Sequence, residues 1–176
     1  MSNPARDRIL DRLRGASPGE PGVPETVCMP IETFSKPERI RKLQSLLEAV
    51  RSEVHVVPRD GWTAKLREVL ANRGLETLLY APETDIGKQI EAAWAQDDSG
   101  LPRLCTYDGP IESFKPRLFE IDAAVTTSVG AIAETGAIVL WPDAREPRLM
   151  SLVPPVHIAV LDADRIYNNF CEIIQQ

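Results

Sequence analysis

The chain has 176 residues, a formal net charge of -6 at pH 7, 43% hydrophobic residues and 26% charged residues. This length corresponds to one ordinary domain with a genuine hydrophobic core. The composition is that of a globular protein rather than a disordered or membrane-spanning one. The negative charge and the lack of a Lys/Arg cluster argue against a nucleic-acid partner, because binding to phosphates requires a basic face.

The cysteines and histidines do not form a recognisable metal or disulfide pattern. Cys28, Cys105 and Cys171 are odd in number and far apart, so we expect three reduced thiols, with Cys105 packed in the core. His55 and His157 are distant and lack a paired carboxylate motif, so no metal site is expected. Neither a secretion signal nor a run of about eighteen apolar residues occurs, which predicts a cytoplasmic protein without membrane contact.

The N-terminal part is expected to be separate from the main domain. Residues 1–15 predict a short amphipathic helix, whose apolar side is formed by Ile9, Leu10 and Leu13. Residues 16–34 are dense in Pro and Gly and predict an extended linker. Residues 35–176 then predict a single α/β domain.

Helix and strand patterns alternate through this domain. Ser35 with Glu38 three residues later is a capping-box signature, and apolar residues at helical spacing continue from there to Val50. The later elements are, in chain order, a strand at 54–57, a helix from Trp62 to Gly74, a strand at 77–80, a helix through Ile86 and Trp94, a strand at 104–107, a helical turn ending near Ile121, strands at 123–127, 137–141 and 157–161, and a C-terminal helix with Ile166, Phe170, Ile173 and Ile174 facing inward.

This alternation predicts a mostly parallel sheet with helices on its faces, because parallel neighbours need long crossover connections. The connection between residues 127 and 137 is too short for a crossover helix. The strands on either side of it therefore either pair antiparallel or flank a tight functional loop.

Candidate ligand-binding residues follow the strand at 123–127. Thr127 and Ser128 belong to a hydroxyl cluster with Thr126, and open α/β sheets place ligands at strand ends of this kind. Gly130 and Gly136 would allow the backbone to turn sharply or to approach a ligand closely. A simple turn is the alternative for both glycines.

Three charged or titratable residues are the candidates for chemistry. Glu134 is the one acid in an otherwise apolar stretch, where burial is costly unless the group is hydrogen-bonded, paired or functional. Arg148 follows a loop stiffened by proline and is suited to bidentate capture of a carboxylate or phosphate. His157 follows two prolines at a strand start. The alternatives are a solvated arginine and a structural histidine.

The segments IAETGAIVL and RLMSLVPPVHIAVL resemble the signature of lactate utilization protein C, a family that carries the LUD domain. The resemblance rests on Ala133 to Gly136, which include Glu134 and Thr135, followed by Arg148, Ser151, Pro154 and His157. It implies a three-layer α/β sandwich similar to the sugar-phosphate isomerase and CoA-transferase group. It also implies a bacterial cytoplasmic complex in which two iron–sulfur subunits work with this chain to oxidise L-lactate to pyruvate. No cofactor is expected in this chain itself, because its cysteines cannot form a cluster site.

Three functions remain open at this point. The first is a non-redox subunit in which Arg148 holds a small carboxylate or another anion and Glu134 or His157 acts catalytically, with Thr127, Ser128, Gly130, Thr135, Gly136 and Ser151 as further ligand contacts. The second is a stand-alone enzyme for a phosphorylated or CoA-linked metabolite, with Glu134 as an acyl-accepting carboxylate. The third is a scaffold in which Glu134 and Arg148 pair internally. The first function requires Glu134, Arg148 and His157 to meet around one solvent-accessible hollow.

Overall fold

The computed structural model describes residues 4–15, 33–96, 100–107 and 111–175. The chain divides into two units, residues 1–31 and residues 32–176. In the first unit, helix α1 spans Pro4–Gly15, and its apolar residues Ile9 and Leu13 are exposed. The predicted linker at 16–34 lies outside the described residues except for Thr33 and Phe34, so it stays a prediction.

The second unit is built around a four-stranded parallel sheet with the strand order β2-β1-β3-β6. Its strands are β1 (Thr77–Tyr80), β2 (Arg103–Thr106), β3 (Ala123–Thr127) and β6 (Val156–Val160). All four strands were predicted, and two of them have the predicted bounds. Since the strands are parallel, their carboxyl ends lie at one edge of the sheet.

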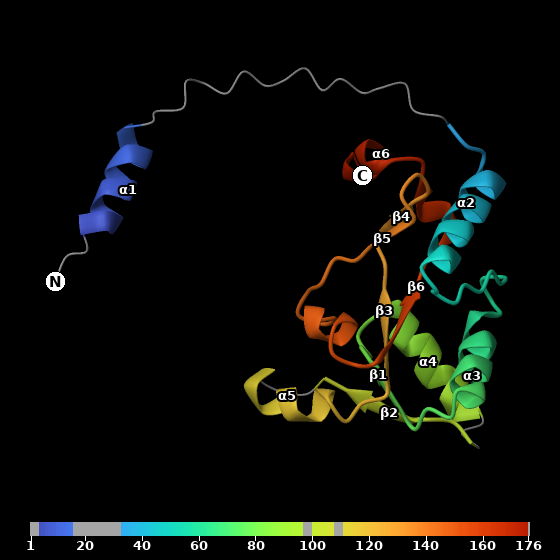
Figure 1. Ribbon diagram of the computed structural model, residues 1–176. Coiled ribbons are helices and arrows are strands. Elements are labelled where there is room, and N and C mark those ends of the chain that lie inside the picture. Colours follow the sequence, from blue (N-terminus) through green and yellow to red (C-terminus); the bar gives the residue numbers. More distant parts are fainter. Residues whose placement is uncertain (1–3, 16–32, 97–99, 108–110, 176) are drawn as a thin grey trace. The chain divides into compact units, whose positions relative to one another are not determined.

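Helices cover both faces of this sheet (Figure 1), which confirms the predicted three-layer α/β sandwich. The helices are α3 (Trp62–Asn72) and α4 (Asp85–Gln96) on one face, and α5 (Ile111–Leu118) with the 3₁₀ helix η1 (Arg148–Ser151) on the other. The alternation of strand side chains explains the layers: Leu78 packs with the α3 and α4 layer, whereas Leu79 packs with α5 and η1. Cys105 lies in the second of these clusters, as predicted.

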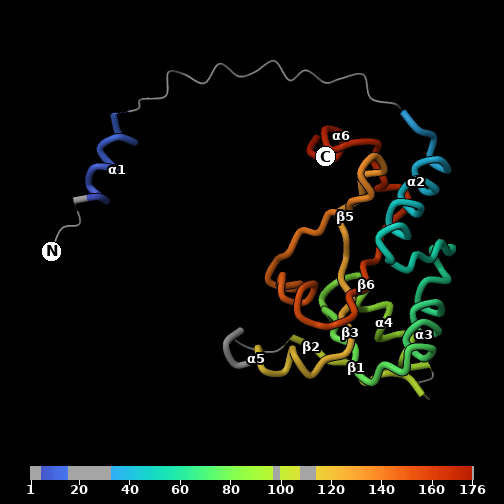
Figure 2. The backbone as a smooth tube through the Cα atoms, viewed as in Figure 1, coloured from blue at the N-terminus to red at the C-terminus, as the bar shows by residue number. Residues whose placement is uncertain are grey.

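A smaller three-stranded sheet, with the order β5-β4-β7, follows the end of β3. Its strands are β4 (Gly130–Ile132), β5 (Ala137–Val139) and β7 (Ile166–Tyr167), and the neighbouring helices are α2 (Lys36–Ala49), η2 (Ala163–Arg165) and α6 (Phe170–Ile174). Leu43 of α2 packs against Ala131 and Ile166 of this sheet. Figure 2 shows the chain after β5 running out to the segment that contains η1 and returning through β6.

One strand prediction was wrong, and another strand is shorter than predicted. Residues 54–57 form no strand, and Val56 is 59% exposed, because this β-branched run between α2 and α3 has no neighbouring strand to bond. The strand predicted at 137–141 ends at Val139 and pairs antiparallel with β4 instead of with β3. The sequence did not predict β4, because a strand of three residues is too short to show the alternation of side chains that marks a strand. This strand is the one that pairs with β5.

The C-terminal helix is also shorter than predicted. Ile166 belongs to β7, and Phe170 and Ile174 are exposed, so only Ile173 of the four predicted inward residues is buried in α6. The side chain of Asn169 caps α6 by accepting a hydrogen bond from the backbone of Glu172. A helix of five residues has little more than one turn, which leaves room for one inward position.

Asp122 ties the amino ends of β1 and β3 together. Its carboxylate accepts hydrogen bonds from the backbone N–H groups of Glu76 and Thr77, at 2.9 Å each, and from the Thr77 hydroxyl at 3.0 Å. The backbone bond from Glu76 is the largest of the causes that lower the pKa of Asp122 below its usual value. The ionised form therefore stabilises the folded state.

We expect Asp122→Asn to lower the free energy of unfolding at pH 7 by about 1–2 kcal/mol, the lower part of the range for hydrogen bonds to a charged group, because the site is partly exposed. The folded-state pKa lies below the unfolded value of about 3.9. The contribution is therefore complete above that value and is lost as the pH falls through the folded-state pKa. Urea unfolding of both proteins between pH 7 and pH 3 tests this. A difference of equal size at both ends of the range would contradict it.

Candidate functional site

The carboxyl edge of the four-stranded sheet is the first place to expect a site. From β1 the chain goes to β2 on one side and later to β3 on the other, so the order of strands switches between β1 and β3. Open α/β sheets bind ligands outside the carboxyl ends of strands at such a switch point. The residues that end β3 therefore lie where a ligand-binding site is expected.

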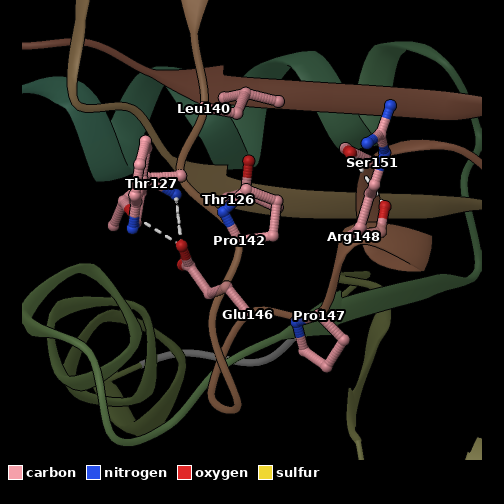
Figure 3. Close-up of a pocket in the computed structure, with 9 residues that line it drawn as sticks. Thr126, Thr127, Leu140, Pro142, Glu146, Pro147, Arg148 and Ser151 are labelled. Carbon is pink, nitrogen blue, oxygen red and sulfur yellow. Dashed lines mark hydrogen bonds between the residues drawn. The ribbon is translucent and has the colours of Figure 1, made fainter. Parts of the chain in front are cut away.

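A small hollow lies beside the end of β3, with about 220 Å³ of space that includes open solvent. Thr126 and Thr127 of β3 form one wall, and the chain from Leu140 to Pro147 forms another. Figure 3 shows Glu146 pointing toward Thr127 on one side of the hollow, with Arg148 and Ser151 on the other side. Thr127, Arg148 and Ser151 were predicted to bind ligand, and the structure brings these three together.

Arg148 is the first residue of η1, directly after Pro147. Its side chain lines the hollow, and its guanidinium has neither a hydrogen bond nor an ion pair with any residue of the described part of the chain. The hydroxyl of Ser151 donates a 2.9 Å hydrogen bond to the backbone carbonyl of Arg148 and so closes the 3₁₀ turn. The arrangement leaves a guanidinium available to an anion from solvent.

Glu146 is a buried carboxylate that the sequence did not single out. Only 8% of the residue is exposed, and the backbone N–H of Thr127 donates to both carboxylate oxygens at 3.1 Å. The Thr127 hydroxyl donates to the same carboxylate. Glu146 stands between Arg145 and Pro147 in a polar stretch, so its sequence context is that of a solvated charge. Only the folded loop turns it inward.

The loop that carries Glu146, residues 142–147, is here called the covering loop. Asp143 organises it, because its Oδ1 atom accepts hydrogen bonds from the backbone N–H groups of Arg145 and Glu146, at 2.8 and 2.9 Å. The bond from Glu146 is the largest of the causes that lower the pKa of Asp143. These bonds hold the loop in a turn that presents Glu146 to the sheet.

His157 reaches the hollow through Thr126. Ala124 of β3 lies opposite His157 of β6, so strand alternation places Thr126 and His157 on the same face of the sheet, toward η1. The Nε2 atom of His157 is 2.9 Å from the Thr126 hydroxyl. His157 is half-buried, and this desolvation lowers its pKa below the usual value. The neutral ring is therefore favoured at neutral pH, and it can orient the Thr126 hydroxyl.

Glu134 does not share this site. It lies with Thr135 and Gly136 in the turn between β4 and β5, where Glu134 and Thr135 are exposed. The cost of burial that marked Glu134 in the sequence does not arise, because it occupies a hairpin turn. None of the three lines the hollow, and Glu134 forms no ion pair with Arg148. The expected meeting of Glu134, Arg148 and His157 around one hollow is therefore wrong. Of the three, only Arg148 lines the hollow, and His157 is connected to it through Thr126.

Gly130, Gly136 and Ser128 have packing or hydrogen-bonding roles in the structure. A Cβ atom on Gly130 would lie 2.7 Å from the carbonyl oxygen of Arg165. Gly136 has a φ of 72°, and a Cβ atom there would lie 2.6 Å from the Cβ of Leu46. The Ser128 hydroxyl donates a 2.8 Å hydrogen bond to the carbonyl of Val160. Their contacts with a ligand stay predictions.

Neither a metal-binding cluster nor a membrane-spanning helix is present in the described part of the chain. There, no group of three or more His, Cys, Asp or Glu side chains is arranged to hold a metal ion. Within the same residues, no helix is both long and apolar enough to cross a bilayer. Cys28 lies outside the described residues.

The LUD domain model matches residues 40–176. The chain belongs to the LUD domain family. An uncharacterized protein of Neisseria meningitidis serogroup B is 31% identical to it, and the match covers 97% of this chain and 74% of that protein. The crystal structure of a DUF162 family protein from Deinococcus radiodurans matches with a TM-score of 0.62 at 20% identity, over 81% of this chain and 80% of that one. The second likeness shows the fold. The LUD domain family is linked to lactate utilization in general.

The lowered pKa of His157 gives this LUD domain a pH-dependent stability. Because the folded state resists protonation of His157, its contribution is complete above the unfolded pKa of about 6.5 and is lost as the pH falls through the lower folded-state pKa. We expect His157→Gln to reduce the loss of unfolding free energy between pH 8 and pH 5. His55→Gln, at the exposed second histidine, is the matched control and should leave that loss in place. An unaltered pH dependence in His157→Gln would contradict the burial of a neutral imidazole.

Gly136 provides a test of its packing role. Gly136→Ala should destabilise the protein by about 2–5 kcal/mol, because it combines a left-handed conformation, about 1–2 kcal/mol, with overpacking against Leu46, about 1–3 kcal/mol. Gly74→Ala is the control, since Gly74 has a φ of 62° but no atom within 4 Å of its added Cβ. Urea unfolding should show that the losses of unfolding free energy in the two variants differ by the contribution of overpacking alone. Equal losses of stability would remove the contact with Leu46 as the reason for glycine at this position.

Proposed function

We propose that this chain is the non-redox subunit of a cytoplasmic L-lactate utilization system and that it binds a small carboxylate beside Arg148. The observation that carries this proposal is the guanidinium of Arg148, which has no partner among the described residues and lines a hollow at the carboxyl end of β3. The link between the LUD domain family and lactate utilization supports the assignment to such a system.

The hollow offers the groups that a small carboxylate needs. A guanidinium on a short 3₁₀ helix can donate two parallel hydrogen bonds to both oxygens of a carboxylate. Thr126 adds a hydroxyl, and His157 holds that hydroxyl in one orientation from behind. In this proposal His157 acts through Thr126, either by orienting the ligand or by relaying a proton. Glu134 takes no part, because it lies in the hairpin turn outside the hollow.

The redox step is assigned to partners. Conversion of lactate to pyruvate removes two electrons and two protons from the 2-hydroxy acid, so an electron acceptor is required. We assign the acceptor to the iron–sulfur clusters of two partner subunits, since the three cysteines of this chain are too far apart in sequence for a cluster motif. Trp141 at the hollow is 79% exposed and Leu152 beside Ser151 is 62% exposed. Exposed apolar side chains of this kind favour a partner that covers the hollow.

Arg148→Ala should weaken the binding of lactate or pyruvate at least roughly tenfold, because the lost hydrogen bonds to a charged group amount to about 1.5–3 kcal/mol. Isothermal titration calorimetry measures this, and the free energy of unfolding should hardly change because the side chain is exposed. Arg145→Ala is the matched control: Arg145 is exposed on the covering loop, where it pairs with Asp143. Unaltered binding in Arg148→Ala would refute the site.

The same variants test the role in a complex. The isolated wild-type chain should lack lactate dehydrogenase activity and should restore it to the two iron–sulfur subunits, whereas Arg148→Ala should restore much less. Failure of the wild-type chain to restore activity would refute the subunit assignment. Turnover of a phosphorylated or CoA-linked substrate by the isolated chain would instead favour the stand-alone enzyme.

A further inference from the structure

The carboxylate of Glu146 accepts the hydrogen bonds that are available at the end of β3. The donors at this strand end are the backbone N–H and the hydroxyl of Thr127, and both already donate to Glu146. A ligand carboxylate that entered the hollow to reach Thr127 would need the same two donors. Glu146 and such a ligand therefore exclude each other.

The negative charge of Glu146 also disfavours a carboxylate ligand in the hollow. Glu146 and Arg148 line the same hollow, yet they form no ion pair with each other. The guanidinium is therefore not engaged by the acid of its own chain. A ligand carboxylate bound beside Arg148 would nevertheless share the hollow with the negative charge of Glu146, and like charges at short range disfavour each other.

The covering loop has few side-chain bonds to the sheet. Glu146 is its one buried residue, whereas the side chains of Asp143 and Arg145 are 40% and 59% exposed. The bonds from Asp143 to Arg145 and Glu146 lie within the loop and do not depend on the sheet. The side-chain hydrogen bonds that join the loop to β3 are those that Thr127 donates to Glu146 (Figure 3).

We propose that Thr127 forms a carboxylate-binding subsite and that Glu146 is its internal competitor, which a small carboxylate ligand must displace. This inference rests on the proposed function, because it concerns the same hollow. The subsite supplies the N–H and hydroxyl of Thr127 to the ligand, across the hollow from Arg148. The apparent association constant for the ligand then equals the intrinsic constant multiplied by the fraction of molecules in which Glu146 has left Thr127.

Calorimetric titration with sodium lactate and sodium pyruvate tests the proposal. Glu146→Ala should bind the carboxylate about tenfold more tightly than the wild type, a gain that corresponds to about 1.4 kcal/mol. Glu146→Gln should give a smaller gain, because an amide oxygen can still accept a hydrogen bond from Thr127 but carries no charge. Thr127→Val, introduced into Glu146→Ala, should remove part of the gain because the hydroxyl donor is lost.

Glu83→Gln is the matched control. It removes one negative charge from an exposed position in the turn after β1, at the same edge of the sheet, and should leave the affinity unchanged. Hydrogen exchange provides a second readout, since saturating lactate should speed amide exchange in residues 143–146 of the wild type as the covering loop is released. Slower exchange there would mean that the ligand holds the loop in place, and it would overturn the proposal.

The remaining outcomes separate this inference from the proposed function. If the wild type binds through Arg148 and a folded Glu146→Ala binds no more tightly than the wild type, the inference alone is overturned. If the alanine variant does not fold, the affinity of Glu146→Gln decides by the same criterion. Binding by Glu146→Ala but not by the wild type would support the inference in its strongest form. Absence of binding in every variant would overturn both proposals.

Discussion

The pairing of β3 on both of its edges is the constraint on which the rest of the structure depends. β3 bonds to β1 on one side and to β6 on the other, and Ala123, Ala124 and Val125 are fully buried. Small side chains in this strand allow helices to approach both faces of the sheet. The same strand ends in Thr126 and Thr127, so the element that holds the core together also delivers the polar groups of the hollow.

Because side chains alternate along β3, these two threonines contact different partners. Thr126 points toward η1 and meets His157 of the neighbouring strand. Thr127 ends the strand and offers its backbone N–H and its hydroxyl to Glu146. One residue therefore connects the hollow to a half-buried imidazole, while the next connects it to a loop that closes over the sheet.

This hollow combines a guanidinium that has no partner in the described part of the chain with a carboxylate that is already hydrogen-bonded, and this distinguishes it from a simple anion site. A rigid, permanently open arginine site would bind any small anion that reached it. In our proposal, access to the donors of β3 depends on the position of one side chain of the covering loop. The exposed Trp141 lines the same hollow.

The sequence by itself determined the elements whose signals are local. The capping box of α2, the helical spacing in α3 and α4, and the buried strands β1 and β3 follow from residue patterns within a few turns or pleats. Arg148 and the threonines were recognisable from residue type and position. The exposure of Glu134, the inward turn of Glu146 and the absence of a strand at 54–57 were decided by the tertiary structure alone. Burial and strand pairing depend on partners distant in the chain, and a short loop or a three-residue strand carries no periodic signal that reveals them.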